Sequence, residues 1–177
     1  QERRVRSFRD TDGREWEAVV GRESWGTVVA IFVPKKGGGT PRQSLLEVLR
    51  ESAGMLSVKQ GCAVGECGAC TIIVNGQAVN ACLMFAARLY GCEVLTVEGL
   101  DQDGDLHPIQ EAFAEKHAVQ CGFCTPGLLM SARALLSEHQ RPGRAEIIKA
   151  ISGNLCRCTG YKKIEQAILA AAEKMSS

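Results

Sequence analysis

Hydrophobic residues in the first hundred positions follow the short alternating or continuous apolar runs that are typical of β-strands. Three candidate strands precede residue 40, with the sequences VRSF, EWEAVV and GTVVAIFV, and an Asp-Gly turn at 12–13 separates the first two. An Asn-Gly pair at 75–76 predicts a hairpin between TIIV and QAV, and EVLTVEG supplies a further strand. Ser44 and Glu47 form a capping box that predicts one helix. We therefore expect a small α+β unit in which this helix lies on a mixed sheet.

The hydrophobic pattern changes to a helical period after about residue 100. Pro108 is a suitable first helical residue, and Thr125-Pro126 provides a cap and a first position for the segment GLLMSARALL. Two further helical segments, RAEIIKAIS and YKKIEQAILAAAEKM, follow. We place the boundary between the two halves within 98–104. The expected division is a β-rich N-terminal segment of unusual pattern, a central α+β domain and a helical domain, at residues 1–39, 40–100 and 101–177.

Composition excludes several classes of function. The chain has 177 residues, of which 45% are hydrophobic, and this content supports a buried core. Lys and Arg number 21 against 20 Asp and Glu, so no strong net charge attracts nucleic acid or anionic lipid. The longest apolar runs are too short to cross a bilayer, and no secretory leader is recognisable before residue 40. We expect a cytoplasmic protein with no membrane span.

Nine cysteines are the unusual feature of the composition, and eight of them form two sets of four. In the first set the intervals between successive cysteines are four, two and eleven residues, and in the second they are two, thirty-one and one. In a reducing compartment such density indicates metal ligands rather than disulfides. The first set is Cys62, Cys67, Cys70 and Cys82, and the second is Cys121, Cys124, Cys156 and Cys158.

The first set has the spacing of a plant-type [2Fe–2S] ligand set. Three glycines, Gly61, Gly65 and Gly68, lie among the ligands, so the backbone can wrap closely and direct N–H groups at the sulfurs. A structural zinc ion is the alternative. Zinc sites often include histidine, and the three histidines of the chain lie outside both cysteine motifs.

The second set contains the pair Cys156 and Cys158, separated by one residue. A disulfide between them would close a ring too small for ordinary bridge geometry. A diiron cluster accommodates them better, with Cys121 and Cys124 on one iron and Cys156 and Cys158 on the other, while zinc remains the alternative. The ninth cysteine, Cys92, belongs to neither set, and we expect it to be a small buried hydrophobe.

Three ordered motifs, GCAVGECGACT with a later cysteine, QCGFCTPG and NLCRCTGY, resemble the iron–sulfur subunit of the molybdenum hydroxylases. This superfamily includes xanthine dehydrogenase, aldehyde oxidoreductase and carbon monoxide dehydrogenase. The resemblance covers residues 41 to 175. It implies an α+β fold in which a β-grasp ferredoxin-like domain is followed by an all-α four-helix-bundle domain.

The resemblance also implies a role for each site. The second cysteine set would hold the [2Fe–2S] cluster nearest a molybdopterin (Mo) cofactor on a large partner subunit, with Gln120 and Cys158 at the pterin edge. The first set would hold the cluster that faces FAD on a medium subunit. Hydroxylation at molybdenum releases two electrons and each cluster accepts one, so this subunit would relay electrons singly within a hetero-oligomer. The substrate and the final acceptor are determined by other subunits.

Two other classes of function remain as alternatives. A free-standing ferredoxin-type carrier usually has an acidic surface for steering, whereas this chain is nearly neutral. A zinc-stabilised interaction module is the third possibility. Residues 1–39 depart from the family pattern, which usually opens with a short hairpin leading directly to the LLEVLR helix; they are either that hairpin with an insertion or an added extension.

Overall fold

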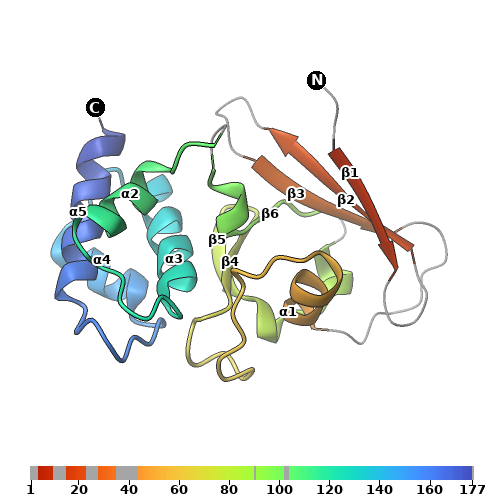
Figure 1. The fold of residues 1–177 in the computed structure, drawn as a ribbon, viewed down its shortest axis with the longest axis horizontal. Helices are drawn as coiled ribbons and strands as arrows, with labels where there is room; N and C mark the ends of the chain where they lie inside the picture. The colour runs from red at the N-terminus through yellow and green to blue at the C-terminus, as the bar shows by residue number, and fades with distance from the viewer. Residues whose placement is uncertain are drawn as a thin grey trace.

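The computed structural model describes residues 4–9, 15–22, 28–34, 44–89, 91–101 and 104–176, and for the first three of these ranges it describes the backbone alone. Strands and one short helix, Leu45–Glu47, lie at one end of the molecule, and the remaining α-helices lie at the other (Figure 1). The expected α+β class is confirmed. No helix in the described ranges has the length and apolarity needed to cross a membrane.

Six strands form one sheet in the order β1-β2-β3-β6-β4-β5. Every ladder in the described sheet is antiparallel, so the expectation of a mixed sheet is wrong. The reason is that β3 is the last strand of an antiparallel meander and meets β6 in the opposite direction, with Ala30 opposite Val94. The bounds are β1 Arg4–Arg9, β2 Glu15–Arg22, β3 Val28–Pro34, β4 Thr71–Val74, β5 Gln77–Asn80 and β6 Val94–Leu95.

The three predicted N-terminal strands are therefore present, and they extend the sheet beyond β6. The predicted hairpin is also present, since Val74 pairs with Gln77 across the turn, and Asn75 and Gly76 have φ angles of 49° and 82°. These positive angles are those that an Asn-Gly turn provides at low cost.

The predicted helix before the cysteine loop begins as α1, Leu45–Glu47, and continues as a π-helical turn over Val48–Ser52. The Ser44 side chain accepts a hydrogen bond from the Glu47 backbone N–H at 3.3 Å, as the capping box predicts. The apolar side of this segment packs with β4 and β6 in the first hydrophobic core, which includes Leu45, Leu49, Ile72, Val74 and Val94.

Four helices form the second half, with bounds α2 Pro108–Glu115, α3 Thr125–Glu138, α4 Arg144–Ile151 and α5 Lys162–Met175. Helix α2 packs on α5 and α3, and α4 packs on α3 and α5. The predicted cap at Thr125 is wrong by one position, because Thr125 is already helical and Cys124 is the cap residue. Pro108 is the first residue of α2, as predicted.

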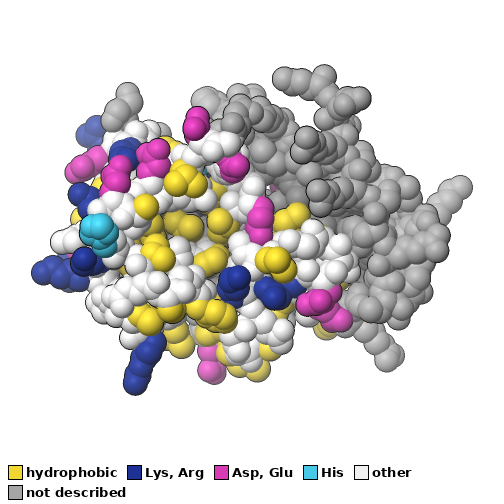
Figure 2. All heavy atoms as spheres, viewed as in Figure 1, with side chains coloured by type: hydrophobic (Ala, Val, Ile, Leu, Met, Phe, Trp, Pro, Cys, Tyr) yellow, Lys and Arg dark blue, Asp and Glu magenta, His cyan; other side chains and the backbone are white. Residues whose placement is uncertain are grey.

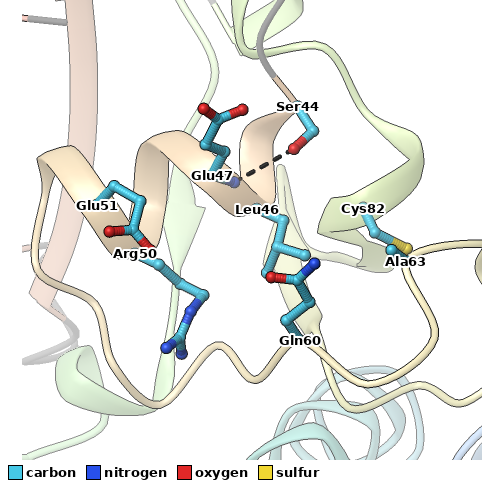
Figure 3. A pocket seen from close by; sticks show the side chains of 8 residues that line it. All are labelled: Ser44, Leu46, Glu47, Arg50, Glu51, Gln60, Ala63 and Cys82. Atoms are coloured by element: carbon cyan, nitrogen blue, oxygen red, sulfur yellow. Dashed lines mark hydrogen bonds between the residues drawn. The ribbon is translucent and has the colours of Figure 1, made fainter. Parts of the chain in front are cut away.

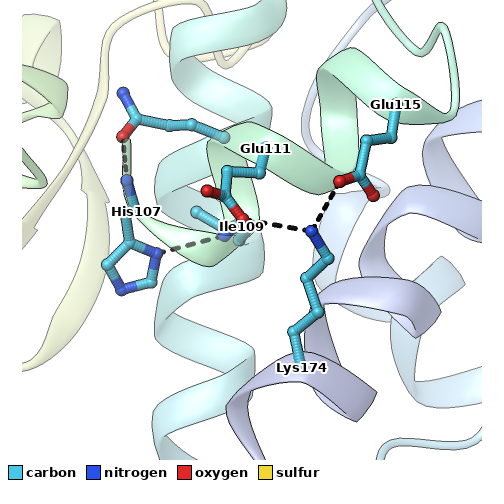
Figure 4. A network of polar contacts seen from close by, with 6 residues as sticks. His107, Ile109, Glu111, Glu115 and Lys174 are labelled. Atoms are coloured by element: carbon cyan, nitrogen blue, oxygen red, sulfur yellow. Dashed lines mark hydrogen bonds and ion pairs between the residues drawn. The ribbon is translucent and has the colours of Figure 1, made fainter. Parts of the chain in front are cut away.

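Polar contacts cap the start of α2 and connect this helix to α5 (Figure 4). The ring Nδ1 of His107 accepts a hydrogen bond from the Ile109 N–H at 3.2 Å, and the Gln110 side chain accepts one from the His107 N–H at 2.9 Å. Lys174 of α5 reaches Glu111 and Glu115 of α2 at 3.0 and 2.7 Å. These contacts tie the last helix to the first helix of this half.

Strand β4 joins the two halves of the molecule because it is buried on both faces. Ile72 and Val74 face the first core, whereas Ile73 packs with Leu128 and other side chains of the helical core. A strand covered on both faces reads as a continuous apolar run, as TIIV does. The two halves therefore share a packed boundary, and the two cysteine loops lie at its edge.

Candidate iron–sulfur centres

The first cysteine loop directs backbone N–H groups at the sulfur of Cys62. The N–H groups of Val64, Glu66 and Cys67 lie 3.4, 3.3 and 3.3 Å from this sulfur. Positive φ angles at Ala63 and at the glycines that follow allow this tight wrapping. The hydrogen bonds, first those from Val64 and Cys67, lower the pKa of Cys62 from 9.0 to about 6. The loop is therefore built to stabilise a thiolate.

The first site leaves no room for a side chain at position 61, which is occupied by Gly61. A Cβ atom on Gly61 would lie 2.5 Å from the sulfur of Cys67. The N–H of Cys62 in turn points at that sulfur, at 3.3 Å. The close approach of backbone to sulfur explains a glycine at this position.

The remaining cysteines of the first set come from the ends of the central hairpin. Cys70 directly precedes β4 and is buried, while Cys82 lies in the 3₁₀ turn Ala81–Leu83 that follows β5. Burial, with the neighbouring Cys82 and Cys67, raises the pKa of Cys70 to about 11. Such a thiol is ionised at neutral pH only if a positive partner, such as a metal, binds the sulfur.

A cavity of about 250 Å³ opens beside this first site (Figure 3). It lies between the start of the α1 segment and the cysteine loop, and the Cys82 side chain is on its wall. Cys82 is therefore reached from the surface on this side. The lining residues are Ser44, Leu46, Glu47, Arg50, Glu51, Gln60, Ala63 and Cys82.

The second set forms at the end of the helical half, where Cys121 and Cys124 precede α3 and Cys156 and Cys158 lie between α4 and α5. The sulfurs of Cys121 and Cys158 are 3.6 Å apart, and both residues are exposed. Cys124 and Cys156 form the inner, half-buried pair, with interacting side chains. The two pairs are also neighbours, because Cys124 interacts with Cys121 and Cys158 with Cys156.

This pairing of sulfurs differs from the expected one, in which Cys121 and Cys124 share one iron. Two thiolates about 2.3 Å from one tetrahedral metal ion lie roughly 3.7 Å apart. The separation of 3.6 Å between Cys121 and Cys158 fits that value, and Cys124 is beside Cys156 instead. The physical reason is that the two loops approach side by side, so each pair takes one sulfur from each loop.

The inner pair has a strongly asymmetric environment. Burial raises the pKa of Cys124 to about 12, with the neighbouring Cys156 thiol contributing. Burial also opposes ionisation of Cys156, but hydrogen bonds from Thr159 outweigh it and lower the pKa of that thiol. The Thr159 Oγ lies 3.0 Å from the Cys156 sulfur. Cys156 is therefore the better prepared thiolate of the inner pair.

The donor set fits a binuclear cluster better than a single ion. Sulfurs in both sites are arranged as adjacent pairs, which suits two metal ions with two thiolates each. Within the part of the chain that the structure describes, no three Cys, His, Asp or Glu side chains converge as a single bound ion would require. Zinc in a tetrahedral site would need four such ligands around one point.

The two cysteine loops touch each other through backbone and side-chain hydrogen bonds. The N–H of Leu155 donates to the carbonyl oxygen of Cys67 at 2.9 Å. The Asn154 side chain, which is 3% exposed, donates to the Gly68 carbonyl at 2.9 Å and accepts from the Ser131 hydroxyl at 2.7 Å. These hydrogen bonds therefore join the chain at Cys67, in the first set, to the chain directly before Cys156, in the second set.

Gln120 and Cys92 are the two remaining residues to which the sequence analysis assigned a role or an environment. Gln120 is exposed and precedes Cys121 at the open end of the second site. Cys92 is half-buried, packs against the first core and directs its sulfur at the Arg88 carbonyl, 3.6 Å away. Cys92 therefore packs against the core but is only half-buried, not buried as expected.

Three residues near the second site escaped the sequence interpretation: Asn154, Thr159 and Tyr161. The Tyr161 hydroxyl accepts from the Cys156 N–H at 2.7 Å and donates to the Asn154 carbonyl at 3.1 Å. Tyr161 has a φ of 66°, which a bulky residue adopts only when its surroundings compensate. All three residues lie within the motif NLCRCTGY, so the motif marked them as candidates. Their positions in the sequence do not show which atoms they hydrogen-bond.

Comparisons with known proteins agree with this arrangement of two sites. The family described as "2Fe-2S iron-sulfur cluster binding domain" matches residues 39–88, and the family described as "[2Fe-2S] binding domain" matches residues 96–169. These two family matches confirm the expectation of two [2Fe–2S] clusters, one for each half of the chain.

Individual relatives are similar over most of their length. The nicotinate dehydrogenase small FeS subunit of Eubacterium barkeri is 48% identical over 137 residues, which cover 77% of this chain and 87% of that protein. The xanthine dehydrogenase iron-sulfur-binding subunit of Escherichia coli O157:H7 is 52% identical over 133 residues, covering 74% and 81%. The structure of quinoline 2-oxidoreductase from Pseudomonas putida 86 superposes with a TM-score of 0.74 at 38% identity, covering 97% of this chain and 96% of that one.

Proposed function

Because the chain belongs to the family of iron–sulfur subunits of the molybdenum hydroxylases, we propose a specific path for the electrons that it transfers. They come singly from a molybdopterin centre on a large partner subunit, pass the second and then the first cysteine site, and leave to FAD on a medium subunit. The observation that carries this proposal is the hydrogen bond from Leu155 to Cys67, which joins the two cysteine loops.

We propose that the first cluster is held by Cys62, Cys67, Cys70 and Cys82, and the second by Cys121, Cys124, Cys156 and Cys158. When bound, each [2Fe–2S] cluster accepts and releases one electron. The role of the chain is to hold the thiolates and to stabilise their charge. At the first site this is done by the three N–H groups around Cys62, and at the second by the Thr159 hydroxyl.

The second site is proposed to face the molybdopterin, with Gln120 and Cys158 at the pterin edge. Its outer cysteines are exposed, and they are surrounded by exposed apolar side chains: Phe123 is 48% exposed and Leu155 61%. Figure 2 shows hydrophobic side chains among the described residues of one face. Apolar groups around a reactive centre suit burial against a partner subunit.

The short connection between the sites supports transfer between them. From Cys67 the path crosses one hydrogen bond to the Leu155 N–H, and Cys156 is the next residue in the chain. The first site would then pass the electron to FAD on the medium subunit. The cavity beside Cys82 and the exposed side chains of Val64 and Leu83 provide the surface for that contact.

The same proposal includes the domain organisation and the cellular setting. Residues 40–100 would form the plant-type ferredoxin-like domain, residues 101–177 a four-helix-bundle cluster domain, and residues 1–39 an addition to the sheet. The packing of α2 to α5 around a common core supports the bundle. The nine unpaired cysteines support a reducing compartment, the cytoplasm.

Metal and sulfide analysis of the purified chain tests the cofactor assignment. We expect about four irons and four sulfides per chain, with two distinct paramagnetic signals after dithionite reduction. Zinc in place of iron would contradict the proposal.

Purification from the native host tests the partners. We expect the chain to be isolated with a larger subunit that contains molybdenum and a subunit that contains FAD. If instead the chain is isolated alone with both clusters intact, the free-standing carrier is the correct interpretation.

A further inference from the structure

The hydroxyl group of Thr159 contacts a sulfur atom of the second cysteine site. The Thr159 Oγ lies 3.0 Å from the sulfur of Cys156. Among the eight proposed ligand cysteines, all within the described part of the chain, Cys156 is the one whose sulfur is hydrogen-bonded by a side-chain hydroxyl. The sulfur of Cys62, by comparison, is contacted by backbone N–H groups.

The direction of this hydrogen bond follows from the charge state of the sulfur, and the remaining contact of Thr159 is compatible with it. Its Oγ accepts a hydrogen bond from the Tyr161 N–H at 3.3 Å. A metal-bound thiolate has no proton and acts only as an acceptor. The hydroxyl proton of Thr159 therefore points at the sulfur of Cys156.

The loop holds both partners of this bond in place. The Tyr161 hydroxyl accepts from the Cys156 N–H and donates to the Asn154 carbonyl, at 2.7 and 3.1 Å. Tyr161 adopts a positive φ of 66°, and its N–H donates to Thr159. Thr159 and Tyr161 thus contact Cys156 from its sulfur and its backbone, so the hydroxyl has little freedom to turn away.

Resting on the proposed function, we propose that Thr159 is a positioning residue that raises the reduction potential of the second cluster through its hydrogen bond to Cys156. One-electron reduction adds one negative charge to the unit formed by the four thiolates and the group that they bind. A hydroxyl proton directed at a sulfur stabilises that added charge, so it favours the reduced form.

The position of the bond favours one end of the second site. Cys156 belongs to the inner pair, and the residue before it, Leu155, bonds the first cysteine loop. Cys121 and Cys158 form the exposed pair at the opposite end. Thr159 therefore stabilises an electron on the side of the second site from which it leaves toward the first.

Redox titration of the intact complex, followed through the paramagnetic signal of each cluster, tests the role of Thr159. Thr159→Val keeps the shape of the side chain and removes the hydroxyl, and Thr159→Ser keeps the hydroxyl. We expect T159V to shift the reduction equilibrium of the second cluster roughly fivefold to tenfold toward the oxidised form, about 40 to 60 mV. T159S should retain the wild-type value, and the signal of the first cluster should not move in either variant.

Thr125→Val is the matched control. Thr125 follows Cys124, the partner of Cys156, and the structure describes no hydrogen bond of its hydroxyl to a cysteine sulfur. The same loss of a hydroxyl beside the same pair should leave the potential of the second cluster unchanged.

The outcomes separate this inference from the proposed function. Equal potentials in wild type and T159V, with both clusters present, would overturn the role of Thr159 and leave the proposed function intact. Absence of a second [2Fe–2S] signal from wild type would overturn the proposed function itself. If T159V does not assemble the cluster, Thr159→Ala is compared with T159S; loss of the cluster in both hydroxyl-free variants would assign the hydroxyl to assembly and overturn the tuning role.

Discussion

The backbone N–H of Leu155 donates a hydrogen bond of 2.9 Å to the carbonyl oxygen of Cys67. These residues are far apart in the chain, yet one is a proposed ligand of the first cluster and the other precedes a proposed ligand of the second. The packing that maintains this contact comes from side chains at the boundary of the two halves. The distance between the two centres therefore depends on residues that bind no metal.

Asn154 is the first residue predicted to maintain this boundary. Asn154→Asp preserves the shape but replaces the amide donor, so an oxygen would face the Gly68 carbonyl in a buried setting. Loss of a buried hydrogen bond with an unpaired group left behind costs about 3 kcal/mol. For a chain of this size the melting temperature should fall by roughly 6 to 12 °C.

Asn75→Asp is the control for this change. The Asn75 side chain uses its oxygen to accept from the Glu93 N–H at 2.8 Å, and aspartate keeps that acceptor. Thermal unfolding of both variants, with both clusters present, measures the difference. Equal melting temperatures for N154D and wild type would show that the buried amide does not hold the boundary.

Gly127 is the second residue on which the boundary depends. A Cβ at this position would lie 2.1 Å from the Gly68 carbonyl oxygen, a backbone atom that moves only if the cysteine loop moves. We expect Gly127→Ala to destabilise the protein by at least about 3 kcal/mol and to weaken the magnetic coupling between the two reduced clusters.

Gly153→Ala separates this steric effect from a general effect of glycine replacement. Gly153 lies in the same junction, but a Cβ there has open space within 4 Å, and its φ is not positive. Its replacement should change the stability by less than about 1 kcal/mol. A similar loss in both variants, measured by thermal unfolding, would contradict the steric explanation for Gly127.

His107 is predicted to make the stability of the helical half depend on pH. Burial, with a smaller effect of nearby Arg133, lowers the pKa of His107 from 6.5 to about 4. The unfolded chain then binds a proton more readily than the folded chain, so the stabilisation is complete above pH 6.5 and falls as the pH approaches 4. The full difference is about 3 kcal/mol.

His107→Asn should remove this dependence and keep the helix cap, because asparagine also accepts from the N–H near a helix start. Urea unfolding at pH 7 and pH 4.5 measures it, with stability compared between variant and wild type at each pH. His117→Asn, at an exposed residue with a φ of 52°, is the control, since asparagine tolerates that angle. The prediction is wrong if wild type and H107N lose equal stability in acid.

The cysteines should divide into three groups by iron content. Cys70→Ser is expected to lose about two irons from the first site, and Cys124→Ser about two from the second, because each removes one proposed ligand of a binuclear cluster. Cys92→Ser should keep about four irons, because its sulfur bonds a carbonyl and lies outside both sets. Iron and sulfide analysis of the three purified variants measures the pattern, and iron loss in C92S would refute the ligand assignment.

Local sequence determined much of this protein before any packing is considered. The capping box at Ser44, the Asn-Gly hairpin at 75–76 and the first turn of α2 at Pro108 each involve residues within a few positions of one another. The spacing of the cysteines predicted two [2Fe–2S] sites for a similar reason, because a short backbone segment places the sulfurs within each cysteine loop. Short-range geometry of this kind is encoded directly in residue type and interval.

Only the tertiary structure decided which sulfurs are neighbours and what joins the two sites. Cys121 lies beside Cys158 rather than beside Cys124, because the loop before α3 and the loop between α4 and α5 approach side by side. The contacts of Asn154 with Gly68 and of Leu155 with Cys67 likewise join segments more than eighty residues apart. Such contacts follow from how two packed cores fit against the shared strand β4, and no local pattern of residues specifies that fit.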